Sequence, residues 1–281
     1  MKKLIVLPMI LFASAVYACD GVLPHNDLRI PMDKNEGLSR LQYDQVINKV
    51  QKIYEPIAVE HGAVLKIARK WSSSTVNAGT YRDEEGKHWH MNLYGGLARH
   101  PFMTEDAYAL VICHELGHHI GGAPKKIIKK KQDWSSTEGQ ADYWANLKCL
   151  RRVFKDENNS AAIQDAEVPA IVTKECEASF RLKSETDLCI RLGMASKALT
   201  KISAVARRTE TPEFETPDSS IVTQHYFKHP LPQCRLDSFF QGALCQRDFA
   251  TAVSQVHERP GTCHPDHGDQ TGNRPLCWYK P

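Results

Sequence analysis

The 281-residue sequence has little net charge, no internal repeat, and no long hydrophobic run after its N-terminal segment. Lysine and arginine number 36 against 33 acidic residues, a formal net charge of +3, so the overall balance gives no indication of a nucleic-acid partner. No later stretch has the ~20 consecutive apolar residues that a membrane-spanning helix needs. The composition, 42% hydrophobic and 25% charged, is typical of one globular domain or of one domain with a smaller appendage.

The N-terminal segment, MKKLIVLPMILFASAVYACD, is typical of an export signal. Lys2 and Lys3 form a basic end, residues 4–15 form a short apolar core, and residues 16–18 offer a small-residue cleavage site. The apolar core is too short for a comfortable membrane span. We therefore predict a signal peptide over residues 1–18 and a protein exported to a bacterial periplasm or envelope, or secreted.

The sequence has nine cysteines, and in an oxidising compartment most of them should be paired. Cys19 directly follows the predicted cleavage site, and VYAC resembles a bacterial lipobox, although Tyr17 is bulky for its position. Two outcomes are left open for Cys19. It is lipidated, which would be the protein's only attachment to a membrane, or it follows an ordinary cleavage site and is paired elsewhere or free. The other eight lie in sequence-local couples, which favours, without fixing it, the pairing of Cys113 with Cys149, Cys176 with Cys189, Cys234 with Cys245, and Cys263 with Cys277.

Hydrophobic periodicity predicts an α+β protein that is mainly helical. The predicted helices cover residues 38–61, 104–121 and 137–154, and the predicted strands cover residues 63–71, 74–82 and 87–94. Asp83-Glu84-Glu85-Gly86 is a plausible hairpin turn between the last two strands. We expect a zincin-like fold with a small antiparallel sheet flanking the helix at 104–121, and a disulfide-stapled C-terminal region.

The chain is expected to form one main domain over residues 19–233 and a cap over residues 234–281 that packs on it. From Cys234 the sequence is rich in cysteine, glycine and proline, which favours a stapled cap over an independent domain. The lysine-rich stretch at 125–131 is interpreted as a solvated loop, in preference to a surface for acidic substrates or an anionic surface.

The stretch ICHELGHHIGG predicts a metal site. His114 and His118 are four residues apart on a predicted helix, so their imidazoles project from one face with Glu115 beside them. Zinc suits this set, because it binds imidazole nitrogen and lowers the pKa of bound water towards ~7. His119 points about a third of a turn away and is not expected to join the site. We therefore predict one Zn²⁺ ion, with Glu115 as the catalytic base.

The third protein ligand is predicted to be a carboxylate. A pattern H-E-x-x-H-x-x-G-x-x-H would supply a third histidine, but its last position here is Pro124, which cannot ligate. STEGQADYWANLKC instead supplies Glu138 and, four residues later, Asp142, which share a face on a helix. We expect Glu138 to bind zinc and Asp142 to accept a hydrogen bond from a ligating imidazole.

With HELGH followed by EGQAD, the sequence resembles the gluzincin metallopeptidases of the CAAX prenyl protease and HtpX family. VNAGTY, NLYGGL and TEDAYALVICHELGHH follow that family's order, and HPLPQCR resembles its His-Pro segment with an arginine six residues later. The resemblance covers about residues 40–240 and implies that His229 and Arg235 reach the bound substrate and the oxyanion. The sequence differs from the family in its high cysteine content and in its tail after residue 245. It also lacks the transmembrane helices of the integral-membrane members, so it resembles a soluble or lipid-anchored periplasmic branch.

The expected function is that of an exported zinc endopeptidase that hydrolyses peptide bonds in extended or unfolded protein segments, with envelope protein quality control as one role. An edge strand near Trp89–Leu93 would hold a protein or peptide substrate by main-chain pairing. Two alternatives are a zinc-stabilised envelope binding or chaperone-like protein with vestigial hydrolysis, and a zinc hydrolase of cell-wall peptide cross-links. The presence of Glu115 and Arg235 favours the enzyme.

Overall fold

The computed structural model describes residues 21–128 and 130–281. The predicted signal peptide and Cys19 lie outside the described residues. The strands are β1 (Val64–Lys70), β2 (Ala78–Arg82), β3 (His88–Tyr94), β4 (Lys125–Ile128) and β5 (Lys131–Ser136). The helices are α1 (Arg40–Glu60), α2 (Gly95–Ala98), α3 (Glu105–Ile120), α4 (Glu138–Trp144), α5 (Arg151–Phe154), α6 (Asn159–Ile163), α7 (Ala170–Ser179), α8 (Lys183–Arg207) and α9 (Pro232–Leu244).

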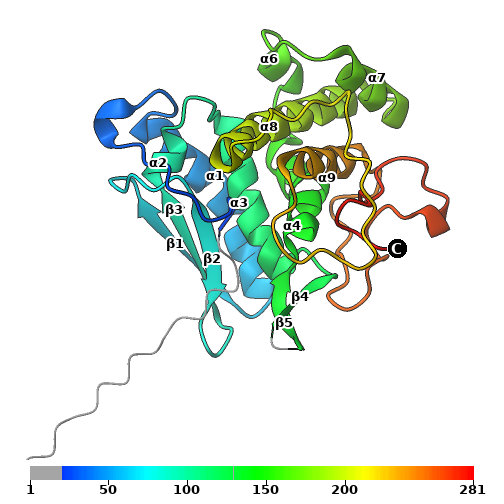
Figure 1. The fold of residues 1–281 in the computed structure, drawn as a ribbon, viewed down its shortest axis with the longest axis horizontal. Coiled ribbons are helices and arrows are strands. Elements are labelled where there is room, and N and C mark those ends of the chain that lie inside the picture. Colours follow the sequence, from blue (N-terminus) through cyan, green and yellow to red (C-terminus); the bar gives the residue numbers. More distant parts are fainter. Residues whose placement is uncertain (1–20, 129) are drawn as a thin grey trace, which may run out of the picture.

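The fold class is α+β, as predicted, with a small sheet on one side and helices on the other. Figure 1 shows α3 running between the sheet and the group formed by α4, α8 and α9. Helix α1 packs against both β1 and α3. It begins with a capping box, in which Ser39 accepts from the backbone N–H of Gln42 while the Gln42 side chain accepts from the N–H of Ser39. The central position of α3 places its side chains in the main core.

The three-stranded sheet has the order β1-β3-β2, with β2 antiparallel and β1 parallel to β3. The expectation of an edge strand near Trp89–Leu93 is therefore wrong, because β3 has a neighbour on each side. Alternation of apolar residues shows which face of a strand is buried but not how many strands pair with it. The edge on the far side from β1 belongs to β2.

The lysine-rich stretch is not a solvated loop, because its residues 125–128 belong to β4 and residue 131 begins β5, and the two strands form a β-hairpin. Strands β4 and β5 pair antiparallel across a turn in which Lys130 has a φ of 64°. Lys125 and Lys126 are each only 8% exposed. The run of lysines conceals the strand because long lysine stems can bury their methylene groups while the ammonium reaches a polar partner.

Eight cysteines form four disulfides. The pairs Cys113–Cys149 and Cys176–Cys189 are as predicted, but the other two are Cys234–Cys277 and Cys245–Cys263. The predicted Cys234–Cys245 pair fails because α9 separates these residues. Eleven residues of helix extend about 16 Å, far more than the ~6 Å that a disulfide spans between Cα atoms.

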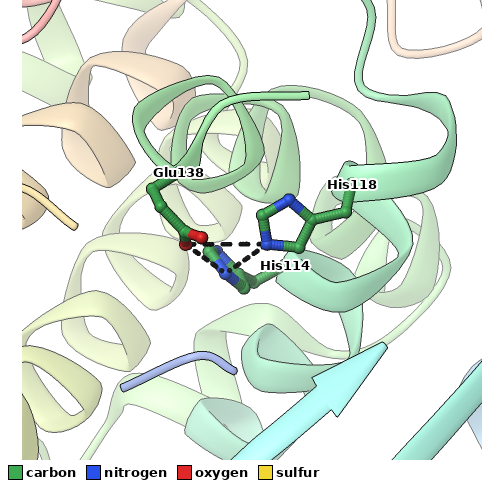
Figure 2. A group of neighbouring side chains, drawn as sticks. All are labelled: His114, His118 and Glu138. Carbon is green, nitrogen blue, oxygen red and sulfur yellow. Dashed lines mark hydrogen bonds and ion pairs between the residues drawn. The ribbon is translucent and has the colours of Figure 1, made fainter. Parts of the chain in front are cut away.

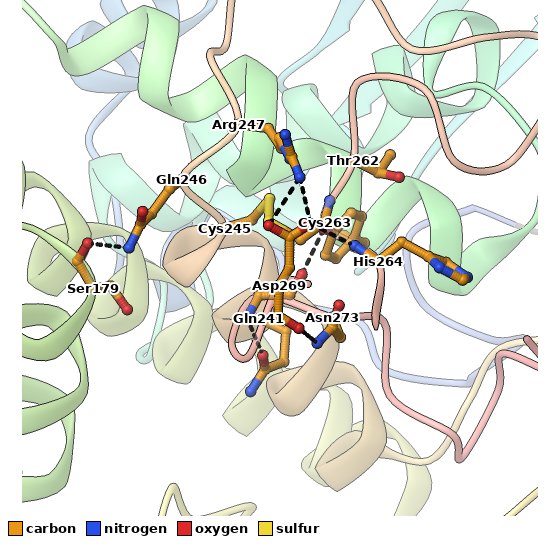
Figure 3. The surroundings of a disulfide bond; sticks show 12 residues. Ser179, Gln241, Cys245, Gln246, Arg247, Thr262, Cys263, His264, Asp269 and Asn273 are labelled. Atoms are coloured by element: carbon orange, nitrogen blue, oxygen red, sulfur yellow. Dashed lines mark hydrogen bonds and ion pairs between the residues drawn. A yellow bond between two sulfur atoms is a disulfide. The ribbon is translucent and has the colours of Figure 1, made fainter. Parts of the chain in front are cut away.

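The C-terminal tail is held against α4 and α9. The boundary expected between residues 233 and 234 falls inside α9, whose buried side packs on α4 and α8, so the irregular cap begins after Leu244. Trp278 lies directly on α4, since a Cβ on Gly139 would be 2.2 Å from the Trp278 ring. Around the Cys245–Cys263 disulfide, the Asp269 carboxylate accepts from Arg247 at 2.7 Å and from the backbone N–H of His264 at 3.0 Å (Figure 3).

Within the described part of the chain, no helix combines the length and the apolar character that crossing a membrane requires. The four disulfides indicate an oxidising compartment, which agrees with export.

Candidate metal centre

Helix α3 presents the two histidines of the predicted metal site. Thr104 caps the helix by accepting from the backbone N–H of Ala107 at 3.1 Å, and two acidic residues occupy the first turn. Every residue from Ala107 to Ile120 is buried, as expected of a helix enclosed by other elements. His114 and His118 are both 0% exposed. Their position four residues apart on a rigid, enclosed helix fixes the direction of both rings.

Helix α4 brings the carboxylate to the same place. Thr137 accepts from the backbone N–H of Gln140 at 3.3 Å, so the helix begins at Glu138. Helices α3 and α4 pack together, and the Cys113–Cys149 disulfide joins α3 to the π-helical turn that continues α4. Glu138 is 1% exposed and therefore faces α3 and not solvent.

The structure brings together His114, His118 and Glu138, the three residues predicted as metal ligands (Figure 2). The two Nε2 atoms lie 3.2 Å apart, and Glu138 Oε2 lies 3.3 Å from His114 Nε2 and 3.6 Å from His118 Nε2. Atoms that share one metal ion lie about this far from one another, because each is ~2 Å from the ion. The spacing thus fits a single ion.

The outer nitrogens of both rings are fixed by hydrogen bonds. His118 Nδ1 lies 2.9 Å from the carbonyl oxygen of Ser136, which can only accept, so Nδ1 carries the hydrogen and Nε2 the lone pair. His114 Nδ1 lies 2.7 Å from Asp142 Oδ1, the arrangement expected for the carboxylate that orients a ligating imidazole. Two ring nitrogens and a carboxylate oxygen therefore converge, which is a donor set that zinc prefers.

The protonation of the two rings differs. Burial lowers the pKa of His118 to about 4, so its ring is neutral at pH 7. Burial also acts against the charged form of His114, but the carboxylates of Asp142 and Glu138 outweigh it and raise the pKa to about 9. A metal ion binding here would have to displace the proton from His114 Nε2.

Glu115 lies next to these ligands with its carboxylate buried. It is 0% exposed, and neither carboxylate oxygen has a hydrogen-bond partner among the described residues. Burial raises the pKa of Glu115 to about 7. An unsatisfied buried carboxylate is costly, so its retention beside a metal-ligand cluster is typical of a group that handles protons.

Lys126 and His229 also contact Glu138. Lys126 Nζ lies 2.7 Å from Glu138 Oε1, and His229 Nε2 lies 3.3 Å from Glu138 Oε2. Although burial alone would raise the pKa of Glu138, His229 and Lys126 hold it well below its usual value. Lys126 could not be recognised from the sequence, because nothing in a run of five lysines and two isoleucines distinguishes the one that reaches inward.

Arg235, on α9, is completely buried and forms a bidentate ion pair with Asp142. Its Nε and Nη2 lie 2.8 and 2.7 Å from the two carboxylate oxygens of Asp142. The third contact of the guanidinium is a 2.5 Å hydrogen bond from Nη1 to the backbone carbonyl of Val22. Arg235 therefore holds Asp142 against His114 and also reaches a main-chain carbonyl beside the site.

Replacing Asp142 by Asn is expected to weaken zinc binding by about 10–100-fold, the usual cost of removing a carboxylate behind a ligating histidine. The neutral amide would retain the shape but not the charge that favours zinc-bound His114. Equilibrium competition with a zinc chelator measures the change. Asp187→Asn, a carboxylate on α8 that pairs with Lys183, is the matched control and should leave zinc affinity unchanged. Equal affinity in Asp142→Asn and the wild type would contradict this role.

His119 does not join the metal cluster. It stacks between Trp89 and Trp134, Nε2 lies 2.6 Å from Thr80 Oγ1, and Nδ1 accepts from Arg82 Nε at 3.1 Å. It joins α3 to β2 and β5 as a structural residue.

A second group of potential ligands lies at Asp218, Cys234 and Cys277. Both cysteines belong to the same disulfide, so neither offers the thiolate that would bind a metal ion.

Neither a family model nor a curated protein nor a solved structure matches this chain. The likeness to gluzincin peptidases therefore stays a prediction from the quoted motifs.

Proposed function

We propose that the protein is an exported zinc-dependent endopeptidase of the gluzincin type that hydrolyses peptide bonds in extended or unfolded protein segments. The observation that supports this most is the convergence of His114, His118 and Glu138, with the buried carboxylate of Glu115 beside them and no hydrogen-bond partner for it among the described residues. Three protein ligands would leave the fourth position of a zinc ion for water, and Glu115 is a group suited to moving a proton beside it.

A zinc ion held by His114, His118 and Glu138 would supply Lewis acidity at this position. Glu115 would accept the proton of the attacking water and later give it to the leaving nitrogen, a task for which a pKa of about 7 is well placed. His229 Nε2 is the N–H donor positioned to stabilise charge on the carbonyl oxygen. Arg235 orients Asp142, and its Nη1 donates to the backbone carbonyl of Val22 beside the site.

A cavity of about 520 Å³ opens beside Glu138 and His229 and would receive substrate side chains. Lys126, Arg207 and Lys228 line it together with two isoleucines of β4 and two aromatic residues at 226 and 227. The apolar residues of this lining suit aliphatic side chains of a peptide, and its basic residues suit acidic ones. The one carboxylate in the lining is that of Glu138, which belongs to the metal cluster. The edge that would pair with a substrate main chain is β2, in place of β3.

We place the enzyme in the bacterial periplasm or envelope, or outside the cell, where it would act in protein quality control. The predicted signal peptide and the four disulfides support export. Lipidation of Cys19 remains a prediction from the sequence.

Digestion of casein by purified, oxidised protein tests the proposed function. We expect cleavage with zinc bound, loss of cleavage with a chelator, and recovery when zinc is restored. A zinc-stabilised binding protein would bind the metal in stoichiometric amount and leave casein intact, and that result would contradict the proposal.

A further inference from the structure

The chain's own residues Gly21–Leu23 lie along the edge of the sheet next to the metal cluster. The backbone N–H of Val22 donates to the carbonyl of Ala78, the first residue of β2, at 2.9 Å. The side chain of Asn77 accepts from the N–H of Leu23 and donates to its carbonyl, each at 3.0 Å. Val22 and Leu23 are both 0% exposed. The segment is thus held beside the first residue of β2 by hydrogen bonds of its main chain, one to the backbone of Ala78 and two to the side chain of Asn77.

The two residues expected to bind substrate bind this segment instead. His229 Nε2 lies 2.6 Å from the carbonyl oxygen of Gly21, and Arg235 Nη1 lies 2.5 Å from that of Val22. The same His229 Nε2 is 3.3 Å from Glu138 Oε2, which belongs to the metal cluster. His229 Nε2 therefore contacts both the Gly21 carbonyl oxygen and the Glu138 carboxylate, which brings the Gly21–Val22 peptide bond next to the metal cluster.

Glycine is required at residue 21 for this approach. Its φ is +104°, and a Cβ there would lie 2.1 Å from the Ala78 carbonyl oxygen and 2.6 Å from Asn77 Oδ1. Only glycine at residue 21 therefore lets the backbone approach Ala78 this closely while the Gly21 carbonyl contacts His229.

We propose that the protein hydrolyses its own Gly21–Val22 peptide bond and that its mature chain begins at Val22. Water adds across the bond: its oxygen joins the Gly21 carbonyl carbon to give a carboxylate, the C–N bond breaks, and Glu115 passes the proton to the Val22 nitrogen, which leaves as an amine. The proposal rests on the proposed endopeptidase function and names a first substrate for it. The bond is held within the same molecule, so the step needs no encounter with a second chain.

The test compares the N-terminus of four versions of the full chain, exported and purified with disulfides intact, by intact mass and N-terminal sequencing. We expect the wild type to begin at Val22 and Glu115→Gln to retain residues before Gly21, with cleavage slower by at least ~100-fold. Val22→Pro lacks the N–H that donates to Ala78 and should also retain them. Val22→Ala keeps that N–H and is the matched control, which should be cut like the wild type. The same N-terminus in the wild type and Glu115→Gln overturns the proposal.

A measurement that needs no activity tests the placement of the segment. In the uncut Glu115→Gln protein, the amides of Val22 and Leu23 should exchange slowly with deuterium, and Asn77→Ala in that background should accelerate exchange at Leu23. Fast exchange at both amides in the uncut protein overturns the proposal and leaves the endopeptidase function standing.

Casein digestion separates the two ideas. A wild type that digests casein while keeping its Gly21–Val22 bond refutes self-cleavage alone. A zinc-loaded wild type that cuts neither casein nor itself refutes both.

Discussion

Replacing Glu115 by Gln is expected to lower endopeptidase activity by about 10²–10⁴-fold while the protein keeps its zinc, because the amide cannot take a proton from water. The carboxylate of Glu115 is buried beside the metal cluster, and its oxygens have no hydrogen-bond partner among the residues that the structure describes. Gln has nearly the same shape, so the packing of α3 and the direction of His114 and His118 should be unchanged. Rates of casein or peptide cleavage, with bound zinc quantified in the same samples, measure the effect.

The matched control for this change is Glu177→Gln on the exposed side of α7, which should retain the full rate. Cleavage by zinc-loaded Glu115→Gln at a rate near that of the wild type would show that another group acts as the base.

Glu138→Ala is expected to weaken zinc binding by more than ~100-fold. That factor is the upper end of the loss expected when a residue that orients a ligand is replaced, and Glu138→Ala removes a ligand itself. The loss has a second cause. Lys126 and His229 both contact the Glu138 carboxylate. Its removal would leave the Lys126 ammonium and the His229 ring without this negative partner, next to a zinc ion held only by His114 and His118. Competition with chelators of known affinity measures the change, and Asp142→Asn gives the milder reference.

Two results for Glu138→Ala have separate meanings. Weaker zinc binding with an unchanged near-ultraviolet spectrum and intact disulfides indicates the loss of a ligand from a folded protein. Wild-type zinc affinity would exclude Glu138 as a ligand and would require another donor close to the two imidazoles.

Local sequence patterns were sufficient to predict the parts of the site that lie within single helices. The four-residue spacing of His114 and His118 fixes their common face once α3 is recognised, and the cap at Thr104 marks where α3 begins. The same spacing applies to Glu138 and Asp142 on α4. Their meeting with the histidines followed from the small number of ligands that a zinc ion accepts and not from any pairing signal in the sequence.

The parts that sequence did not predict depend on contacts between distant segments. Residues 234 and 245 are close in sequence, but α9 holds them apart, so each cysteine pairs with the tail. The central place of β3 depends on its parallel pairing with β1, in addition to its antiparallel pairing with β2. The inward reach of Lys126 depends on where β4 lies relative to Glu138, which no periodicity records.

The approach of Gly21 and Val22 to the site was also beyond sequence analysis. Their short segment has no periodicity, and its contacts with His229 and Arg235 span more than two hundred residues of chain. A glycine followed by two aliphatic residues is common in loops, and only the folded structure shows that these residues lie between β2 and the metal cluster.

The account depends on one zinc ion bound by His114, His118 and Glu138, and zinc K-edge X-ray absorption on the zinc-loaded wild type tests it most directly. We predict one zinc per chain, bound only by nitrogen and oxygen at about 2.0–2.2 Å, with the multiple scattering of two imidazoles and a changed spectrum in Glu138→Ala. A sulfur ligand at about 2.3 Å, or a spectrum that Glu138→Ala leaves unchanged, would contradict the account.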